Sequence, residues 1–445
     1  MIKDRYGNGL STKSRRAMDA YDRALEMLRL YAGDPIAALD EALEADPEFT
    51  MAWAVRAGVL AQQMDKAYHE EAERSLRAGI ASEGTAHERA HLKAAGYWVQ
   101  GRYDDAVVSY ARIAQENPRD LFAVQSAHVG CFFIGRQSDL RDYPLQALRR
   151  YRRGDDGYHA LIGMAAFGLE ECGDFDRALD LAHEAVELEP RDGWAVHAAA
   201  HVHEMRGDTN AGVQWIGKTA KGWGESGFAY HNWWHLALLH LDRGEPQIAL
   251  NLYDTKIWPS SDAQVLMEWI DASAMLWRLH LEGVETGDRF EKLSQCWARA
   301  RGDAIYAFND LHALMAFIGA GSSEDAKRVL GAMRKAAGGE SDNAYMARAI
   351  GLPLAEAFIA FGEGRYGACV ENILAVRGIA QRFGGSHAQR DIITLTALHA
   401  AIKGGMNEIA EALAFERTTH KPQSPWAKSL AARASGIGGA AAAAV

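Results

Sequence analysis

Histidines gather at helical spacing in one stretch of the chain, residues 193–254. His197 and His201 are four positions apart, and so are His231 and His235, which puts both members of each pair on one face of a helix. Imidazole titrates near neutral pH and binds divalent metals when neutral, so these pairs suit proton transfer or metal ligation. The same stretch holds Glu204, His203, His240, Trp194, Trp215, Trp223, Trp233 and Trp234. We therefore expect a binding or catalytic site here.

Helical repeats are the elements that must position these side chains. Residues 159–192 contain Gly173, then Ala178, then Pro190, and residues 87–120 have the same pattern. Glycine supplies the positive φ that ends a first helix, alanine lets two helices pack closely, and proline stops the second helix. A repeat of this length and pattern resembles the tetratricopeptide repeat.

We expect an all-α fold, a tetratricopeptide-repeat-like α–α superhelix (solenoid) of degenerate helical hairpins, because each hairpin needs neighbours to bury its apolar face. This single continuous superhelix spans residues 1–435, and no strand pattern competes with it. Its parts are an N-terminal cap at 11–50, the clearest repeats at 87–254 and degenerate repeats at 262–434. Residues 436–445 form a low-complexity tail that we expect to be disordered.

The repeat register assigns the histidines to the inner face of the superhelix. The first helix of each hairpin lines the concave side, and Gly207 and Gly244 mark the ends of two successive first helices. The positions that face the groove then hold His197, His201, Glu204, His231, Trp234 and His235. His203 and His240 fall on a position that packs inward, so we expect them to be structural. Trp233 is also expected to be a packing residue.

Two later segments could contribute to the same groove. With Gly321 as the turn glycine, His312 faces the groove and follows Asn309 and Asp310 on the same helix. A further helix opens after a double glycine with Ser386 and Gln389, which match a capping box and are expected to be structural. The curve of the superhelix could bring the next residues across the groove. Those residues are His387, Arg390 and Asp391.

Acid–base catalysis on a small molecule fits this set of side chains. Histidines would transfer protons while carboxylates orient their tautomers, and Arg390 could hold a substrate carboxylate. The expected catalytic residues are His201, His235, His312, Glu204 and Asp310. The expected substrate-binding residues are His197, His231, Trp234, Asn309, His387, Arg390 and Asp391. A hydrolase or lyase would use such groups, and no serine or cysteine nucleophile motif, phosphate loop or dinucleotide fingerprint accompanies them.

A metal-assisted version is a subset of this hypothesis. Two HxxxH pairs with Glu204 would suit Zn²⁺, Fe²⁺ or Mn²⁺, although the specific HExxH signature is absent. No cofactor is firmly predicted, and a divalent metal is possible on this spacing. Its ligands would be His197, His201, His231 and His235.

Several motifs together resemble one protein family. HAAAHVHEM, HNWWHLALLHL, FNDLHALMAF and GGSHAQRD, in this order, are similar to the tetratricopeptide repeat protein 38 family, as is YDRALEMLRLYAGDPIAALDEALEADPEF near the N-terminus. The resemblance covers about Ser11 to Trp426, and HNWWH is its most specific part. It implies an α-solenoid of degenerate repeats and supports the choice of groove residues. It implies no established reaction.

Two other classes of function remain open. A tetratricopeptide groove can bind a peptide or protein, but such grooves clamp acidic peptide ends with permanent cations, and histidine and tryptophan hold an anion poorly at neutral pH. A peptide-binding scaffold without catalysis is therefore the alternative to an enzyme with a small-molecule ligand. A homo-oligomer with a purely architectural role is also possible.

Composition limits the partners and the compartment. The 445 residues carry a net charge of −11, which disfavours nucleic acids and anionic membranes as partners. No apolar run approaches the roughly 18 residues that span a bilayer, and the N-terminus lacks the apolar core of a secretory signal. The four cysteines lie far apart, without a CxxC pair, which suits a reducing compartment. We expect a cytoplasmic protein.

Overall fold

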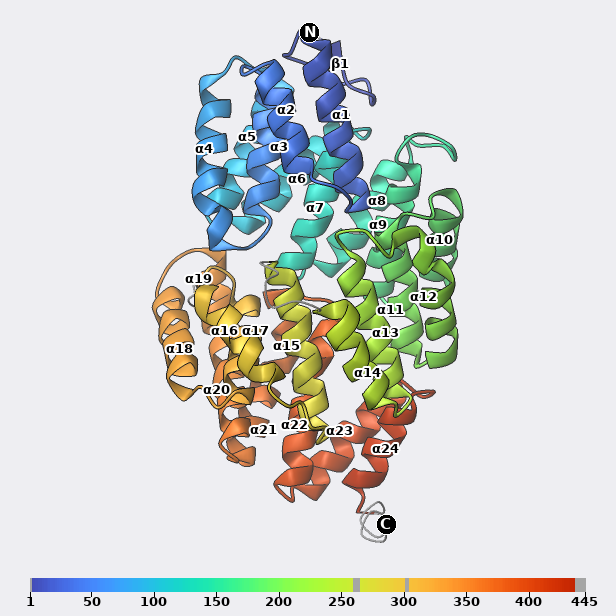
Figure 1. Ribbon diagram of the computed structural model, residues 1–445, viewed down its shortest axis with the longest axis vertical. Helices are drawn as coiled ribbons and strands as arrows, with labels where there is room; N and C mark the ends of the chain where they lie inside the picture. Colours follow the sequence, from blue (N-terminus) through green and yellow to red (C-terminus); the bar gives the residue numbers. More distant parts are fainter. Residues whose placement is uncertain (1, 259–264, 301–303, 437–445) are drawn as a thin grey trace. The chain divides into compact units, whose positions relative to one another are not determined.

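The computed structural model is built from α-helical hairpins, as the sequence predicts, and it describes residues 2–258, 265–300 and 304–436 (Figure 1). These residues form two compact units. Unit 1 comprises Met1–Ala199 with Thr219–Ala229, and unit 2 comprises Ala200–Lys218 with Tyr230–Val445. The single continuous array expected from the repeats stays a prediction, so each unit is described by itself.

Unit 1 begins with a short antiparallel hairpin, in which Ile2 pairs with Leu10, and continues as helices. The sequence pattern did not predict these two strands, which are only two residues long each. The elements are β1 (Ile2–Lys3), β2 (Gly9–Leu10), α1 (Arg15–Leu30), α2 (Pro35–Ala45), α3 (Thr50–Ala61), the 3₁₀ turn η1 (Lys66–Tyr68), α4 (His69–Ala81), α5 (Ala86–Val99), α6 (Tyr103–Glu116), α7 (Leu121–Ile134), α8 (Gln137–Leu148), α9 (Tyr158–Glu171) and α10 (Phe175–Leu188).

The hairpin of α9 and α10 illustrates why the repeats fold. Gly173 joins the helices with φ of 81°, a left-handed conformation that glycine adopts without strain. α9 is buried from Ala160 to Glu171 because α8 and α10 pack on it. α10 buries only three alanines, which let it approach α9 closely while its other residues face outward. The first helix of this pair is therefore the more buried one.

Two helices cross the division between the units, and the rest of unit 2 follows them. α11 (Gly193–Arg206) and α12 (Thr209–Trp223) are each continuous. The elements that follow are α13 (Ala229–Asp242), α14 (Pro246–Leu252), the π turn η2 (Tyr253–Ile257), α15 (Leu266–Leu281), α16 (Arg289–Ala300), α17 (Ala307–Gly319), α18 (Ser323–Ala337), α19 (Asp342–Met346), the π turn η3 (Ala347–Gly351), α20 (Leu352–Gly362), α21 (Tyr366–Val376), the 3₁₀ segment η4 (Arg377–Phe383), α22 (His387–Lys403), α23 (Asn407–His420) and α24 (Pro425–Ala434).

The expectation that no apolar run approaches membrane-spanning length is wrong for one helix stretch, Asp342 to Gly362, which is long and apolar enough by length and composition. Within its most apolar window, 61% of the residues are buried inside the protein, and a core helix passes the same test. α20 packs against α17 and α21 in unit 2. Of the predicted tail at 436–445, only Gly436 belongs to the described residues.

Candidate functional site

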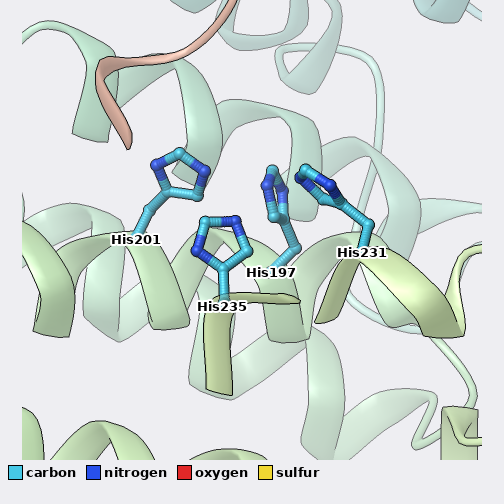
Figure 2. A group of neighbouring side chains, drawn as sticks. All are labelled: His197, His201, His231 and His235. Atoms are coloured by element: carbon cyan, nitrogen blue, oxygen red, sulfur yellow. The ribbon is translucent and has the colours of Figure 1, made fainter. Parts of the chain in front are cut away.

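The histidines chosen from the sequence meet where α11 and α13 lie side by side. His201 is on α11, and His231 and His235 are on α13, one turn apart. His197 precedes His201 by one turn on the continuous helix α11. One ring nitrogen from each of the four histidines lies within 4.8 Å of the others, and Figure 2 shows the imidazoles converging. All four are buried.

Two buried carboxylates hold the imidazoles of α13. Nδ1 of His231 donates to Oδ2 of Asp271 at 2.7 Å, and Nδ1 of His235 donates to Oε2 of Glu204 at 3.0 Å. Because the proton is then on Nδ1, each Nε2 keeps its lone pair. Histidines that bind metals almost always show this arrangement, with the other ring nitrogen bonded to a carboxylate or carbonyl.

Ring contacts fix the planes of these side chains. The ring centroids of His201 and His235 are 4.4 Å apart, and those of His231 and His235 are 5.0 Å apart. The indole of Trp234 stacks on His231 with a centroid distance of 5.3 Å and an interplanar angle of 13°. Trp234 thus supports the imidazoles from within the core, where it is fully buried.

Burial keeps key imidazoles neutral. Burial lowers the pKa of His235 well below its ordinary value, and the neighbouring His201 and His231 lower it further. Burial also lowers the pKa of His312 to about 4, and its Nδ1 donates to the carbonyl of Phe308 at 2.8 Å. Neutral imidazoles accept hydrogen bonds or bind metals at Nε2, but they carry no extra proton to donate at pH 7. This favours ligation over the expected proton transfer by His235 and His312.

Charged groups surround the histidines in unit 2. The guanidinium of Arg278, on α15, is 1% exposed and lies 5.3 Å over the Trp234 ring. It donates to the carbonyls of Ala274 at 3.0 Å and Ala388 at 2.6 Å. Lys421, in the turn before α24, is buried with Nζ 3.6 Å from Oε1 of Glu204. The site therefore combines imidazoles with buried cations and carboxylates.

Hydrogen bonds join α13 to the C-terminal hairpin, which consists of α23 and α24. The carboxylate of Asp242, at the end of α13, accepts from Oγ of Ser424 at 2.6 Å and from the backbone N–H of Trp426 at 3.0 Å. Ser424 caps the N-terminus of α24. Its backbone packs closely on Gly207, because a Cβ added at Gly207 would lie 2.6 Å from the backbone nitrogen of Ser424. These contacts hold the turn that carries Lys421.

The other predicted residues have varied surroundings. Asn309, Asp310 and His312 are buried on α17, which packs against α15. Asp391 forms a two-pronged ion pair with Arg417, at 2.6 and 3.0 Å, so its carboxylate is already neutralised.

The start of α22 differs from the histidine cluster. Its capping box is formed by Ser386 and Gln389, as the sequence predicts. Arg390 donates to the carbonyl of Gly385, in the turn just before the helix, and His387 is partly exposed. Neither belongs to the group of converging histidines.

The remaining aromatic side chains fit structural roles. Nδ1 of His240 donates to Oε2 of Glu245 at 2.6 Å, at the start of the next helix. His203 is buried and packs closely on Gly212, because a Cβ added at Gly212 would lie only 3.0 Å from the Cβ of His203. Trp233 is partly exposed and lies under Lys256, with Nζ 5.3 Å from the ring centroid.

Sequence reasoning missed four groups in unit 2: Asp271, Arg278, Arg417 and Lys421. A signal existed for the first two. They are two turns apart, on one face of an otherwise apolar stretch of α15, where charged residues are costly unless they have a partner. Lys421 and Arg417 offered no such signal because they occur in a polar segment.

Unit 1 contains a second group of metal-ligand type. His87 and His91, one turn apart on α5, both direct Nε2 at Oδ2 of Asp120, at 2.9 and 2.7 Å. The other oxygen of Asp120 caps α7 by accepting from the N–H of Ala123 at 2.9 Å. Nε2 of His91 is hydrogen-bonded to the carboxylate, and Nε2 of His87 lies within ion-pair distance of it.

Comparisons with known proteins find only distant structural similarity. No family model matches the chain. A chain in the crystal structure of the APC/C hetero-tetramer Cut9-Hcn1 is 12% identical, with a TM-score of 0.45, over 94% of this chain and 76% of that one. Human IFIT1, in a dimer with PPP-AAAA, is 13% identical, with a TM-score of 0.42, over 96% of both chains. Likeness at this level carries no argument about function, so the tetratricopeptide-like fold stands on the helical hairpins themselves.

Proposed function

We propose that this protein is an enzyme of the hydrolase or lyase type that holds a divalent transition metal at the histidine cluster and acts on a small molecule. The observation that carries the proposal is the pair of carboxylate–histidine contacts, Asp271 with His231 and Glu204 with His235. Both contacts use Nδ1, as in histidines whose other nitrogen binds a metal, and one ring nitrogen of each lies within 4.8 Å of one from His201 and His197.

The donor set favours particular metals. Imidazole nitrogens suit Zn²⁺ and Fe²⁺, whereas Mn²⁺ prefers oxygen ligands. A catalytic site commonly uses three protein ligands and keeps a position for substrate, and unit 2 alone supplies His201, His231 and His235. A bound metal would act as a Lewis acid on a substrate oxygen. Asp271 and Glu204 would orient the ligands, and Lys421 would balance the charge of Glu204.

Burial of the predicted groove residues argues against the alternative of a peptide clamp. His201, Trp234 and His235 are 0% exposed, so a peptide lying on the surface would not reach them. We also propose that the protein is cytoplasmic and belongs to the tetratricopeptide repeat protein 38 family. The small-molecule ligand and the metal are proposed on the same basis.

Metal analysis of the full-length protein, purified without chelator, tests it. We expect about one Zn²⁺ or Fe²⁺ per chain, and its loss in the double variant His231→Ala/His235→Ala. His240→Ala is the matched control, because this histidine on the same helix bonds Glu245 outside the cluster. Native protein that stays metal-free after loading with either ion, or a double variant that still holds one equivalent, would refute the proposal.

A further inference from the structure

We propose that Arg278 is the substrate-binding residue of this site and that it takes a carboxylate with a single negative charge. The inference rests on the proposed function, because it adds the substrate class to the metal site. Arg278 stands over Trp234, the same indole that stacks on His231 and contacts His235 with a centroid distance of 4.9 Å. The guanidinium is therefore next to the histidine cluster within unit 2.

The guanidinium of Arg278 is buried without a counter-ion. Its hydrogen bonds go to two backbone carbonyls, and none of the described carboxylates forms an ion pair with it. Arginine stays charged at neutral pH, so this buried cation is held by neutral carbonyl oxygens and not by a carboxylate in direct contact. Burial lowers its pKa to about 10, because the attraction of Asp391, Glu204 and Asp271 offsets the loss of solvation only in part.

Other buried arginines of the chain show how such groups are normally satisfied. Arg417 has both oxygens of Asp391 at 2.6 and 3.0 Å. Arg56, which is 8% exposed, bonds Asp40 at 2.7 Å and also Glu71 and Ser75. Removing a charge from water is costly unless a partner compensates for it. Arg278 is thus placed to receive its anion from a ligand.

The surroundings select the kind of anion. The carboxylates of Asp391, Glu204 and Asp271 lie close enough to act electrostatically on Arg278. They would repel a dianion more strongly than a monoanion. A planar carboxylate also matches the two-pronged geometry of a guanidinium. A monocarboxylate therefore fits better than a phosphate.

Two nearby acceptors suggest a further feature of the substrate. Nε2 of His312 and Oδ1 of Asp271 are buried and have no hydrogen-bond partner among the described residues. Both accept hydrogen bonds, since Nδ1 of His312 already carries its proton. A carboxylate that also bears a hydroxyl or amino donor would satisfy them.

Thermal unfolding of the full-length protein tests the carboxylate site. Sodium acetate, compared with sodium chloride at equal ionic strength, should raise the Tm of native protein by about 2 °C when the site is saturated. Arg278→Met should abolish this difference. An equal Tm in acetate and chloride, a shift that survives in Arg278→Met, or a larger shift with phosphate than with acetate would overturn the inference.

A second readout separates ligand binding from a structural role. Without acetate, Arg278→Met should keep or raise the Tm, because it removes an uncompensated buried charge. Arg56→Met, the control, should lower the Tm, because it removes an arginine whose charge is paired and which bonds Asp40, Glu71 and Ser75. If Arg278→Met lowers the Tm as much as Arg56→Met does, the arginine is structural and the inference fails.

The metal content distinguishes the two proposals. Arg278→Met should retain the metal of the native protein, because Arg278 is not among the ligands. A metal-free native protein that still responds to acetate through Arg278 would refute the proposed function alone. A metal-loaded protein without an acetate response would refute only the carboxylate site.

Discussion

Two pairs of histidines with the same HxxxH spacing have opposite surroundings in this protein. In unit 1, His87 and His91 direct Nε2 at the single carboxylate of Asp120. In unit 2, His231 and His235 bond two separate carboxylates, and both use Nδ1 rather than Nε2. The same spacing therefore brings two imidazoles together in both units, but one pair shares a single carboxylate and the other bonds two.

The unit 1 contact belongs to the repeat scaffold. His159 directs Nδ1 at Oδ2 of Asp192 at 2.8 Å, and Oδ1 of Asp192 caps α11 by accepting from Ala195 at 2.9 Å. His159 and Asp192 occupy the same repeat positions as His87 and Asp120. A histidine of one inner helix thus repeatedly bonds the capping aspartate of the next.

The largest effect should come from Asp120→Ala. The change removes the cap of α7 and leaves His87 and His91 without their partner, so the free energy of unfolding should fall by about 3 kcal/mol. Urea unfolding measures it, with the exposed Asp105→Ala as control. Metal content should not change. Loss of metal from Asp120→Ala, with little loss of stability, would show that unit 1 holds the metal instead.

Asp271→Asn should weaken metal binding without removing a ligand. The amide cannot support the Nδ1 proton of His231 as a carboxylate does, and changes of this kind lower metal affinity by about 10–100-fold. Competition with a chromogenic chelator measures the affinity. Glu245→Gln changes the partner of His240 outside the cluster and should leave the affinity intact. Equal metal affinities in Asp271→Asn and Glu245→Gln would show that Asp271 does not orient a metal ligand.

The two aspartates should respond to acid with opposite signs. Burial raises the pKa of Asp120, but His91 and His87 outweigh this and hold it below its usual value. Its stabilisation is present above the unfolded pKa of about 3.9 and is lost as the pH falls through the folded pKa. Burial raises the pKa of Asp271 despite His231, so protonation of Asp271 stabilises the fold as the pH falls through its folded pKa.

Urea unfolding between pH 6 and pH 3 checks these signs. The fall in stability on acidification should be shallower in Asp120→Asn and steeper in Asp271→Asn than in native protein, by up to about 1.4 kcal/mol per pH unit. If both variants change the slope in the same direction, the contrast between the two carboxylates is wrong.

His159→Ala should have the smallest effect, about 1 kcal/mol of unfolding free energy, because it removes one hydrogen bond at a half-buried position. Asp192 keeps its cap on α11, so the helix itself should persist. Thermal unfolding and metal analysis are the measurements. A change in metal content would contradict a purely structural contact.

The sequence predicted the hairpins well because their signals are local. The repeat predicted at 87–120 corresponds to α5 and α6, and the repeat at 159–192 corresponds to α9 and α10. Turn glycines and small residues sit next to the helices that they delimit. The N-terminal strands escaped prediction because two-residue strands have no periodicity.

The site was predicted in part for the same reason. The register of Gly207 and Gly244 placed the histidine pairs on facing helices, and these histidines converge. Contacts between distant segments gave no such signal. The ion pair of Asp391 with Arg417 and the contact of Lys421 with Glu204 depend on how whole hairpins stack. Spacing alone could not distinguish the HxxxH pair in unit 1, which shares one carboxylate, from the pair in unit 2, which bonds two.

The position of Lys421 has a consequence for how the protein is made. Glu204 and His235 leave the ribosome long before Lys421, which comes from the last turn before α24. Because nascent chains fold from the N-terminus, α11 and α13 can pack before Lys421 is synthesised. Until then, the carboxylate of Glu204 lacks the cation of Lys421. Only when the C-terminal hairpin docks on Asp242 does that cation arrive. A chain that stops before this hairpin therefore has an incomplete site.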